Sequence, residues 1–233
     1  MKNGINIIGL ISSPHKNGSS ANLTREVLNS AERKGANIEE LYLPDYNIEF
    51  CKGCMNCLRE NKCILKDDLN LIREKLESCH GIVISSPTYG IAPNGMMMNF
   101  IQRIGIYSVY RSSLAGKYII GIATAGAIGA KKVAKYLTEI TDGLFDLGYR
   151  TGVLGAKLGH ENNMKQKDRK RAYKLGSKLI DDIKNKKKYR IQKIWNKILT
   201  AILIKPIMKK NLKKNKDTYM KGPYNYLHER GVI

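Results

Sequence analysis

Four of the five cysteines lie close together, in the pattern C-x2-C-x2-C-x5-C formed by Cys51, Cys54, Cys57 and Cys63. Three thiolates at successive three-residue steps allow one loop to reach three corners of an iron–sulfur cubane, and the fourth follows on the same loop. Structural zinc usually takes two separated C-x2-C pairs, so the spacing favours a [4Fe–4S] cluster, with zinc or free thiols as alternatives. A disulfide is not expected, because nothing directs the chain to an oxidising compartment. The fifth, Cys79, is interpreted as a small core residue.

A polar loop at residues 12–20 is the second candidate site. It reads Ser-Ser-Pro-His-Lys-Asn-Gly-Ser-Ser and leads directly into a helical pattern. Hydroxyls, backbone N–H groups and the helix dipole together would hold a phosphate dianion, whereas the alternative is a simple capping loop with Ser19 or Ser20 as N-cap. The loop has neither Gly-x-Gly-x-x-Gly nor the Lys-Ser/Thr ending of a Walker loop. It therefore favours a cofactor with one phosphate, and FMN is the usual one in a flavodoxin-like sheet.

Two further loops follow predicted strands, at residues 86–91 and 124–130. The first offers a proline, a flat aromatic ring and a glycine that permits close approach, and the second exposes backbone. Ligands of open parallel sheets bind beyond the carboxyl ends of the strands, so the three loops predict one flat, phosphate-bearing ligand. The residues expected to contact it are Ser13, His15, Lys16, Asn17, Gly18, Ser19, Ser20, Pro87, Thr88, Tyr89, Gly90, Thr124, Ala125 and Gly126.

Strands and helices alternate along the chain and would position these loops. Apolar runs and apolar–polar alternation predict strands at residues 5–11, 38–43, 81–86, 119–124 and 152–156. Helical spacing predicts helices over 23–34 and 67–78, another carrying Val133, Leu137, Ile140 and Leu144, and a long basic helix from about residue 163. Such alternation indicates right-handed βαβ units. We expect an α/β fold, with a flavodoxin-like doubly wound five-stranded parallel sheet over 1–188, the cysteine loop 51–63 inserted in it, and a basic, partly amphipathic extension over 189–233.

The composition is that of a globular chain with a basic tail. The 233 residues are 42% hydrophobic and 26% charged, which is enough for a substantial core. Of the net charge of +21, residues 1–160 carry +5 and residues 161–233 carry +16, which suggests an acidic partner or surface for the tail alone. No apolar run is long enough to span a membrane, and the run at 5–11 is too short for a signal-peptide core. A cytoplasmic location is therefore expected.

The extension contains an apolar helical face that ends before Pro206. Its members are Ile191, Ile194, Trp195, Ile198, Leu199 and Ile202. The favoured interpretation is a helix packed on its own domain or on another subunit, because the tyrosines at 219, 224 and 226 would bury better against protein than in water. A peripheral contact with an anionic membrane is the less favoured one. No nucleic-acid partner is expected, because the basic region has few aromatics and no recognised motif.

These motifs together resemble those of the iron–sulfur flavoproteins, a branch of the NADPH-dependent FMN reductase-like family with a flavodoxin fold. The resemblance covers about residues 4–160 and rests on the loop 12–20, the cysteine motif with its following Lys-Asp-Asp at 66–68, and the segment 85–90. The family pattern Gly-Ser-Pro-Arg reads Ser-Ser-Pro-His here. The pattern Lys-x-Phe-x-Asp-Arg keeps only Phe100 and Arg103.

The resemblance implies an FMN-dependent oxidoreductase that also carries a [4Fe–4S] cluster. It further implies a homodimer or homotetramer, with each FMN near a cluster of a neighbouring chain, and a ferredoxin-like or NAD(P)H electron donor. Flavin and cluster perform the electron transfer, so no catalytic side chain is expected, and His15 and His160 are interpreted as loop residues. Two alternatives remain: an NAD(P)H-dependent FMN or quinone reductase without a functional cluster, and a zinc-containing nucleic-acid-binding protein.

Overall fold

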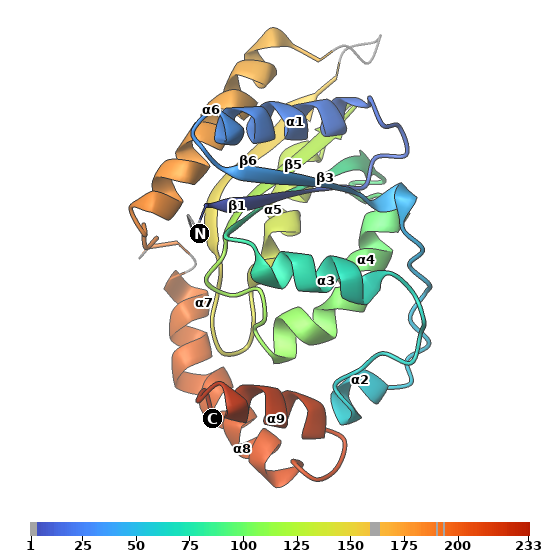
Figure 1. Cartoon of the computed structure of the whole chain (residues 1–233), viewed down its shortest axis with the longest axis vertical. Helices are drawn as coiled ribbons and strands as arrows, with labels where there is room; N and C mark the ends of the chain where they lie inside the picture. The colour runs from blue at the N-terminus through green and yellow to red at the C-terminus, as the bar shows by residue number, and fades with distance from the viewer. Residues whose placement is uncertain (1–3, 159–163, 190, 193) are drawn as a thin grey trace.

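A parallel β-sheet forms the centre of the molecule in the computed structural model (Figure 1), which describes residues 4–158, 164–189, 191–192 and 194–233. The parallel strands are β1 (Asn6–Ile11), β2 (Asn37–Tyr42), β3 (Gly81–Tyr89), β5 (Tyr118–Ala125) and β6 (Tyr149–Lys157), in the spatial order β2-β1-β3-β5-β6. A short strand, β4 (Ala92–Pro93), pairs antiparallel with the end of β3. The order of the five parallel strands is that of flavodoxin-like folds and confirms the prediction; β4 is an addition to it.

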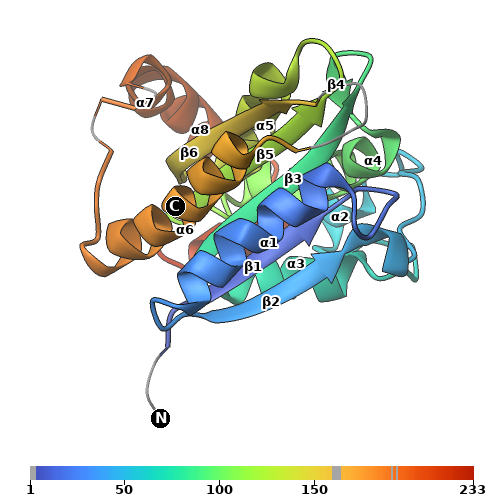
Figure 2. The ribbon, with the colours of Figure 1, turned by 90° about the horizontal axis from the view of Figure 1, so that it is seen from above.

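Helices cover both faces of the sheet. On one face α1 (Ser19–Glu32) and α6 (Gln166–Lys184) lie side by side, as Figure 2 shows. On the other face lie α3 (Leu69–Ser78), α4 (Gly95–Gly105) and α5 (Ala130–Leu137). Successive strand residues point to opposite faces, which explains the continuous apolar runs. Thus Ile7 and Val83 pack with α1 and α6, whereas Ile8 and Ile84 pack in the core of the opposite face.

Two helix predictions need correction. The helix predicted through Ile140 and Leu144 ends as α5 at Leu137 and continues only as a short 3-10 turn, η3 (Thr138–Thr141). Beyond η3, Gly143 N–H donates to Asp146 O and Leu144 N–H donates to Val109 O, so these amides are bonded outside a helix. The basic helix expected from about residue 163 starts as α6 at Gln166. Residue 163 and His160 lie outside the described residues.

The C-terminal extension is helical and lies beneath the sheet domain (Figure 1). It consists of α7 (Ile194–Leu199), a π-helical turn η4 (Thr200–Ile204), α8 (Lys205–Lys214) and α9 (Lys221–Glu229). A separate apolar cluster joins Leu212, Met220 and Leu227 of the extension to Leu58 and Phe145 of the sheet domain. Tyr224 and Tyr226 pack against this cluster, whereas Tyr219 is exposed. In the described part of the chain no helix is long and apolar enough to cross a membrane.

Candidate functional site

A cavity of about 530 Å³ lies at the carboxyl ends of β1, β3 and β5, within the size range of small-molecule sites. All the residues predicted to contact the ligand line this cavity except Lys16 and Gly90. One lining residue, Leu158, was not expected from the sequence; it follows β6, and its N–H donates to Ala125 O at 2.9 Å. The lining residues are Ser13, His15, Asn17, Gly18, Ser19, Ser20, Pro87, Thr88, Tyr89, Thr124, Ala125, Gly126 and Leu158.

The loop between β1 and α1 is held in shape by its own hydrogen bonds. Ser13 Oγ donates to His15 O at 2.9 Å and accepts from His15 N–H at 3.2 Å, and Gly18 N–H donates to His15 O at 2.9 Å. A Cβ atom at Gly18 would lie 2.7 Å from Ser13 Oγ and 3.0 Å from His15 O, so a side chain there would displace part of the loop. Gly18 is the N-cap of α1, whereas Ser19 and Ser20 are its first two residues; the alternative that made either serine the cap is therefore wrong.

No lysine or arginine is among the described residues that line this cavity. Lys16 instead forms an ion pair with Asp45 at 3.2 Å and lies 5.2 Å from the centre of the Tyr42 ring. A phosphate in the cavity would depend on hydroxyls, backbone N–H groups and the positive end of the α1 dipole. Thr88 lines the cavity too, and its hydroxyl is buried with no hydrogen-bond partner in the described structure. The lining therefore fits a flat ligand that carries one phosphate.

Asn94 joins two of the cavity loops and was missed by the sequence analysis. Its Nδ2 donates to Ser12 O at 2.6 Å, its Oδ1 accepts from Ser12 Oγ at 2.9 Å and from Ser86 Oγ at 3.2 Å, and its backbone N–H donates to Ser86 Oγ at 3.0 Å. The same Oδ1 caps α4 by accepting from Met97 N–H. The visible signal was an Asn before an apolar helical run, which is an N-cap pattern. That pattern shows the cap but not the contact with Ser12, 82 residues away.

The four clustered cysteines lie on the long loop between β2 and α3. Cys51 and Cys54 are exposed, whereas Cys57, in the short helix α2 (Asn56–Arg59), and Cys63 are partly buried. Burial raises the pKa of Cys57, and the thiols of Cys63, Cys51 and Cys54 raise it further. Among the described residues, no three Cys, His, Asp or Glu side chains converge on a metal-binding geometry. The donor set itself, four thiols on one loop, fits an iron–sulfur cluster.

Cys79 is separate from the other four. It is buried in the core between α3 and β3, and its Sγ donates to Leu76 O at 3.3 Å. Burial raises its pKa to about 11, so it remains a neutral thiol at physiological pH. This placement agrees with its interpretation as a small core residue.

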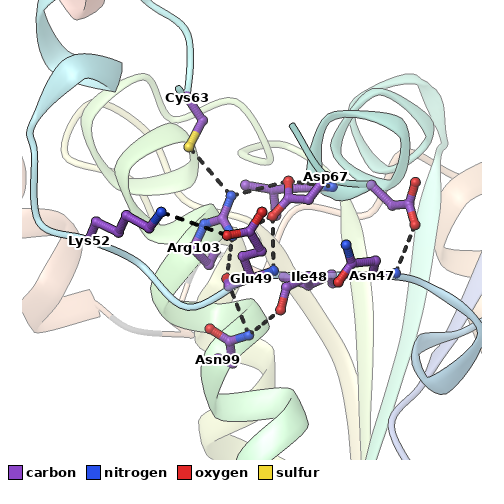
Figure 3. Close-up of polar contacts among 10 residues, drawn as sticks. Asn47, Ile48, Glu49, Lys52, Cys63, Asp67, Asn99 and Arg103 are labelled. Atoms are coloured by element: carbon purple, nitrogen blue, oxygen red, sulfur yellow. Dashed lines mark hydrogen bonds and ion pairs between the residues drawn. The ribbon is translucent and has the colours of Figure 1, made fainter. Parts of the chain in front are cut away.

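Arg103 of α4 connects the cysteine loop to the sheet domain (Figure 3). Its Nη1 donates to Asp67 Oδ2 at 2.6 Å and to Glu49 O, and its Nη2 donates to Asp67 Oδ1 at 3.2 Å and to Cys63 Sγ at 3.4 Å. Burial alone would raise the pKa of Asp67, but Arg103 and the N–H groups of Glu49 and Leu69 lower it overall. One arginine thus holds both ends of the segment that contains all four cysteines.

Helix α4 serves both parts of the candidate site. Its N-cap, Asn94, fixes the cavity loops, and Arg103 in its last turn fixes the cysteine loop. Nine residues separate them, which is about 14 Å along a helix axis. Asn99, between them, donates from Nδ2 to Ile48 O at 2.8 Å and adds a second contact to the start of the cysteine loop. The relative placement of cavity and cysteine loop therefore depends on one rigid element.

Fold and cavity together define a flavodoxin-like protein with a ligand cavity at the carboxyl ends of its strands. The family model described as NADPH-dependent FMN reductase matches residues 5–151, and the chain belongs to this family. It is therefore an FMN-dependent oxidoreductase.

Individual relatives agree with this assignment. Among curated proteins, the chain is similar to an iron–sulfur flavoprotein of Archaeoglobus fulgidus, with 27% identity over 97% of this chain and 99% of that protein. An iron–sulfur flavoprotein of Clostridioides difficile is also 27% identical, over 95% of this chain and 96% of that protein. Among solved structures, a flavone reductase superposes with a TM-score of 0.61 at 18% identity, covering 78% of this chain and 64% of that one. The last likeness shows the fold alone.

Proposed function

We propose that this oxidoreductase binds FMN in the cavity at the ends of β1, β3 and β5 and carries a [4Fe–4S] cluster on Cys51, Cys54, Cys57 and Cys63. It passes electrons between a ferredoxin-like or NAD(P)H donor and a small acceptor. When bound, the flavin exchanges one or two electrons and the cluster exchanges one at a time. The observation that carries the proposal is the set of four cysteines on one loop, which Arg103 ties to the helix that also shapes the cavity.

In this proposal the residues of the cavity bind the flavin and orient it. The hydroxyls of Ser19 and Ser20 and the N-terminus of α1 would hold the phosphate, and Thr88 would lie beside the flavin. Tyr89 presents its ring at the rim of the cavity. The relatives that match almost the entire chain are named iron–sulfur flavoproteins, which supports the cluster assignment.

Anaerobic purification of the full chain, followed by quantitation of flavin, iron, acid-labile sulfide and zinc, tests the proposal. We expect one FMN per chain, with iron and sulfide in the ratio of a [4Fe–4S] cluster. Single Cys→Ser variants at positions 51, 54, 57 and 63 should lose iron and keep flavin, whereas Cys79→Ser, the matched control, should lose neither. FMN without iron or zinc would favour the reductase that lacks a cluster. Stoichiometric zinc without sulfide would overturn the cluster assignment.

We also propose that the protein works as a homodimer or homotetramer. The observation behind this is the apolar stripe of α7 and η4, defined by Trp195, Ile198, Leu199, Ile202 and Leu203, all of which are exposed in the single chain. Contiguous exposed apolar surface of this kind marks interaction sites. The apolar face predicted over residues 191–202 does not pack on its own domain, because its members are exposed in the single chain, whereas α8 and α9 pack on that domain. A second copy of the chain would cover α7.

A further inference from the structure

The C-terminal extension contacts the part of the loop that bears Cys57 and Cys63. Figure 1 shows α9 beside α2 at the lower end of the molecule. Leu58, the residue after Cys57, is only 3% exposed and is buried in the apolar cluster with Leu212 and Leu227 of the extension. The side chain next to a proposed cluster ligand is therefore packed by residues more than 150 positions away in the sequence.

Gly222 brings the backbone of α9 onto the backbone of the cysteine loop. A Cβ atom at this position would lie 2.8 Å from both Leu58 O and Asn61 N. These loop atoms lie between Cys57 and Cys63, so they cannot move aside without moving the segment that carries both thiols. Only glycine permits this approach, which fixes where the loop rests on the extension.

Arg111 joins three elements at the same place. It follows the π-helical turn η2 (Ile106–Tyr110) and is 3% exposed. Its Nη2 donates to Asn61 O at 3.1 Å, and its guanidinium lies 4.2 Å from the centre of the Tyr107 ring and 5.3 Å from that of Tyr226 in α9. One buried cation thus connects the domain, the cysteine loop and the extension, with stacking contacts of the kind that arginine favours.

The cysteine loop contains little secondary structure that could stabilise its conformation. Its one helix, α2, has four residues, far fewer than a helix needs for stability on its own. Met55, Gly53 and Asn61 have positive φ angles, so the loop follows a path that local preference does not impose. A loop of this length keeps one shape only through contacts with other elements.

We infer that α8 and α9 form a clamp that holds residues 57–63 against the rest of the molecule, so that the extension positions the segment that carries Cys57 and Cys63, two of the proposed cluster ligands. This inference rests on the proposed function. Gly222, Leu227 and Arg111 are then positioning residues: they act on the cluster through the backbone of the loop. Among the described residues, none of those that line the FMN cavity belongs to α8, α9 or residues 57–63, so we expect the cavity not to depend on the clamp.

Two full-length variants test the clamp. Gly222→Val places a side chain against the loop backbone, and Leu227→Ala opens the apolar cluster next to Leu58 with a smaller disturbance. The matched control is Ile207→Ser, which changes an exposed residue of α8 that lies outside this cluster and outside the apolar stripe of α7 and η4. The measurements are flavin, iron and sulfide per chain, the rate at which a chelator bleaches the visible absorbance of the cluster, and hydrogen exchange of residues 50–66 in protein freed of metal.

We expect both variants to keep FMN, to lose the cluster to the chelator at least severalfold faster, and to show faster hydrogen exchange within residues 50–66. The control should behave as the wild type. Unchanged exchange and unchanged bleaching in both variants would overturn the clamp. Hydrogen exchange is measured without metal, so it tests the clamp even if the wild type proves to hold no cluster, an outcome that would overturn the proposed function separately. Retained flavin shows that a variant has folded.

Discussion

Arg103 and Asp67 form a buried two-pronged ion pair beside Cys63, and both side chains are only 2% exposed. Arg103 comes from α4, and Asp67 lies four residues after Cys63. Because the guanidinium also reaches the Cys63 sulfur and Glu49 O, the pair joins the end of the cysteine loop to its beginning. The conformation of the loop therefore depends on a side chain that contributes no ligand of its own.

Replacing Arg103 should destabilise the protein and release the cysteine loop. Arg103→Ala leaves the buried Asp67 carboxylate without its partner, which costs about 3–5 kcal/mol. Arg103→Lys should recover only part of this, since one ammonium cannot reproduce the two-pronged contact. Urea unfolding measures the change in the free energy of unfolding. The iron content of the purified variant reports whether the cysteine loop still binds the cluster. The control is Arg25→Ala, which removes a surface pair with Glu40 worth about 1 kcal/mol or less. Equal losses for both arginines would contradict the role given to Arg103.

The phosphate should be held largely by hydroxyls at the start of α1. We expect Ser19→Ala combined with Ser20→Ala to weaken FMN binding by about 1 kcal/mol or more for each hydrogen bond lost to the charged phosphate. Equilibrium dialysis or flavin fluorescence gives the dissociation constant. Ser78→Ala removes an exposed hydroxyl of α3, bound to Lys75 O, and should leave that constant unchanged. If the double variant retains FMN with the affinity of the wild type, the phosphate lies elsewhere.

Asn94 should matter for the cavity although it does not line it. Asn94→Ala removes the contacts between the loops at Ser12 and Ser86 and the cap of α4, so we expect weaker FMN binding and a loss of about 1–3 kcal/mol in stability. Asn94→Asp keeps the capping oxygen but replaces the donor to Ser12 O by an oxygen that repels it. It should therefore restore thermal stability more than it restores flavin affinity. Full flavin affinity in Asn94→Ala would show that the loops keep their shape without this bridge.

Cysteine reactivity should separate Cys79 from the other four. The thiolate is the reactive form, and a pKa of about 11 leaves on the order of one thiolate in ten thousand at pH 7. After metal removal under reducing conditions, iodoacetamide should label Cys51, Cys54, Cys57 and Cys63 within minutes to hours and leave Cys79 free until the protein is unfolded. Peptide mass spectrometry gives the extent at each site. Early labelling of Cys79 would contradict its burial between α3 and β3.

Assembly should depend on the apolar stripe of α7 and η4. Ile198→Asp combined with Ile202→Asp places charges on this stripe without touching the cavity, so we expect smaller assemblies with full FMN content. Sedimentation velocity compares this variant with the wild type and with Lys216→Ala, a charge change outside the stripe. A parallel run with anionic vesicles tests the alternative interpretation, in which the extension binds a membrane surface. Unchanged assembly combined with loss of vesicle binding would show that the stripe faces a membrane.

The amino-acid sequence by itself determined the fold class and the local character of the sites. The apolar runs at β1, β3 and β5 could only be strands covered on both faces, and the loops after them had to meet at one edge of a parallel sheet. The cysteine spacing is likewise a local property, and it is enough to predict a ligand set. The fold prediction is confirmed because periodicity acts over a few residues, whereas the ligand set stays a prediction.

Only the tertiary structure decided how the sites are held. Three contacts join residues that are from 36 to more than 150 positions apart in the sequence. They are the hydrogen bond from Asn94 to Ser12, the ion pair of Arg103 with Asp67, and the close approach of Gly222 to Leu58. The sequence analysis expected Lys16 to contact the cofactor, but the fold places Asp45 within ion-pair distance of it. The packing of the fold determines which residues lie near a given side chain, and no local sequence pattern encodes those contacts. The cavity loops could be listed from the sequence, whereas the elements that support them required the fold.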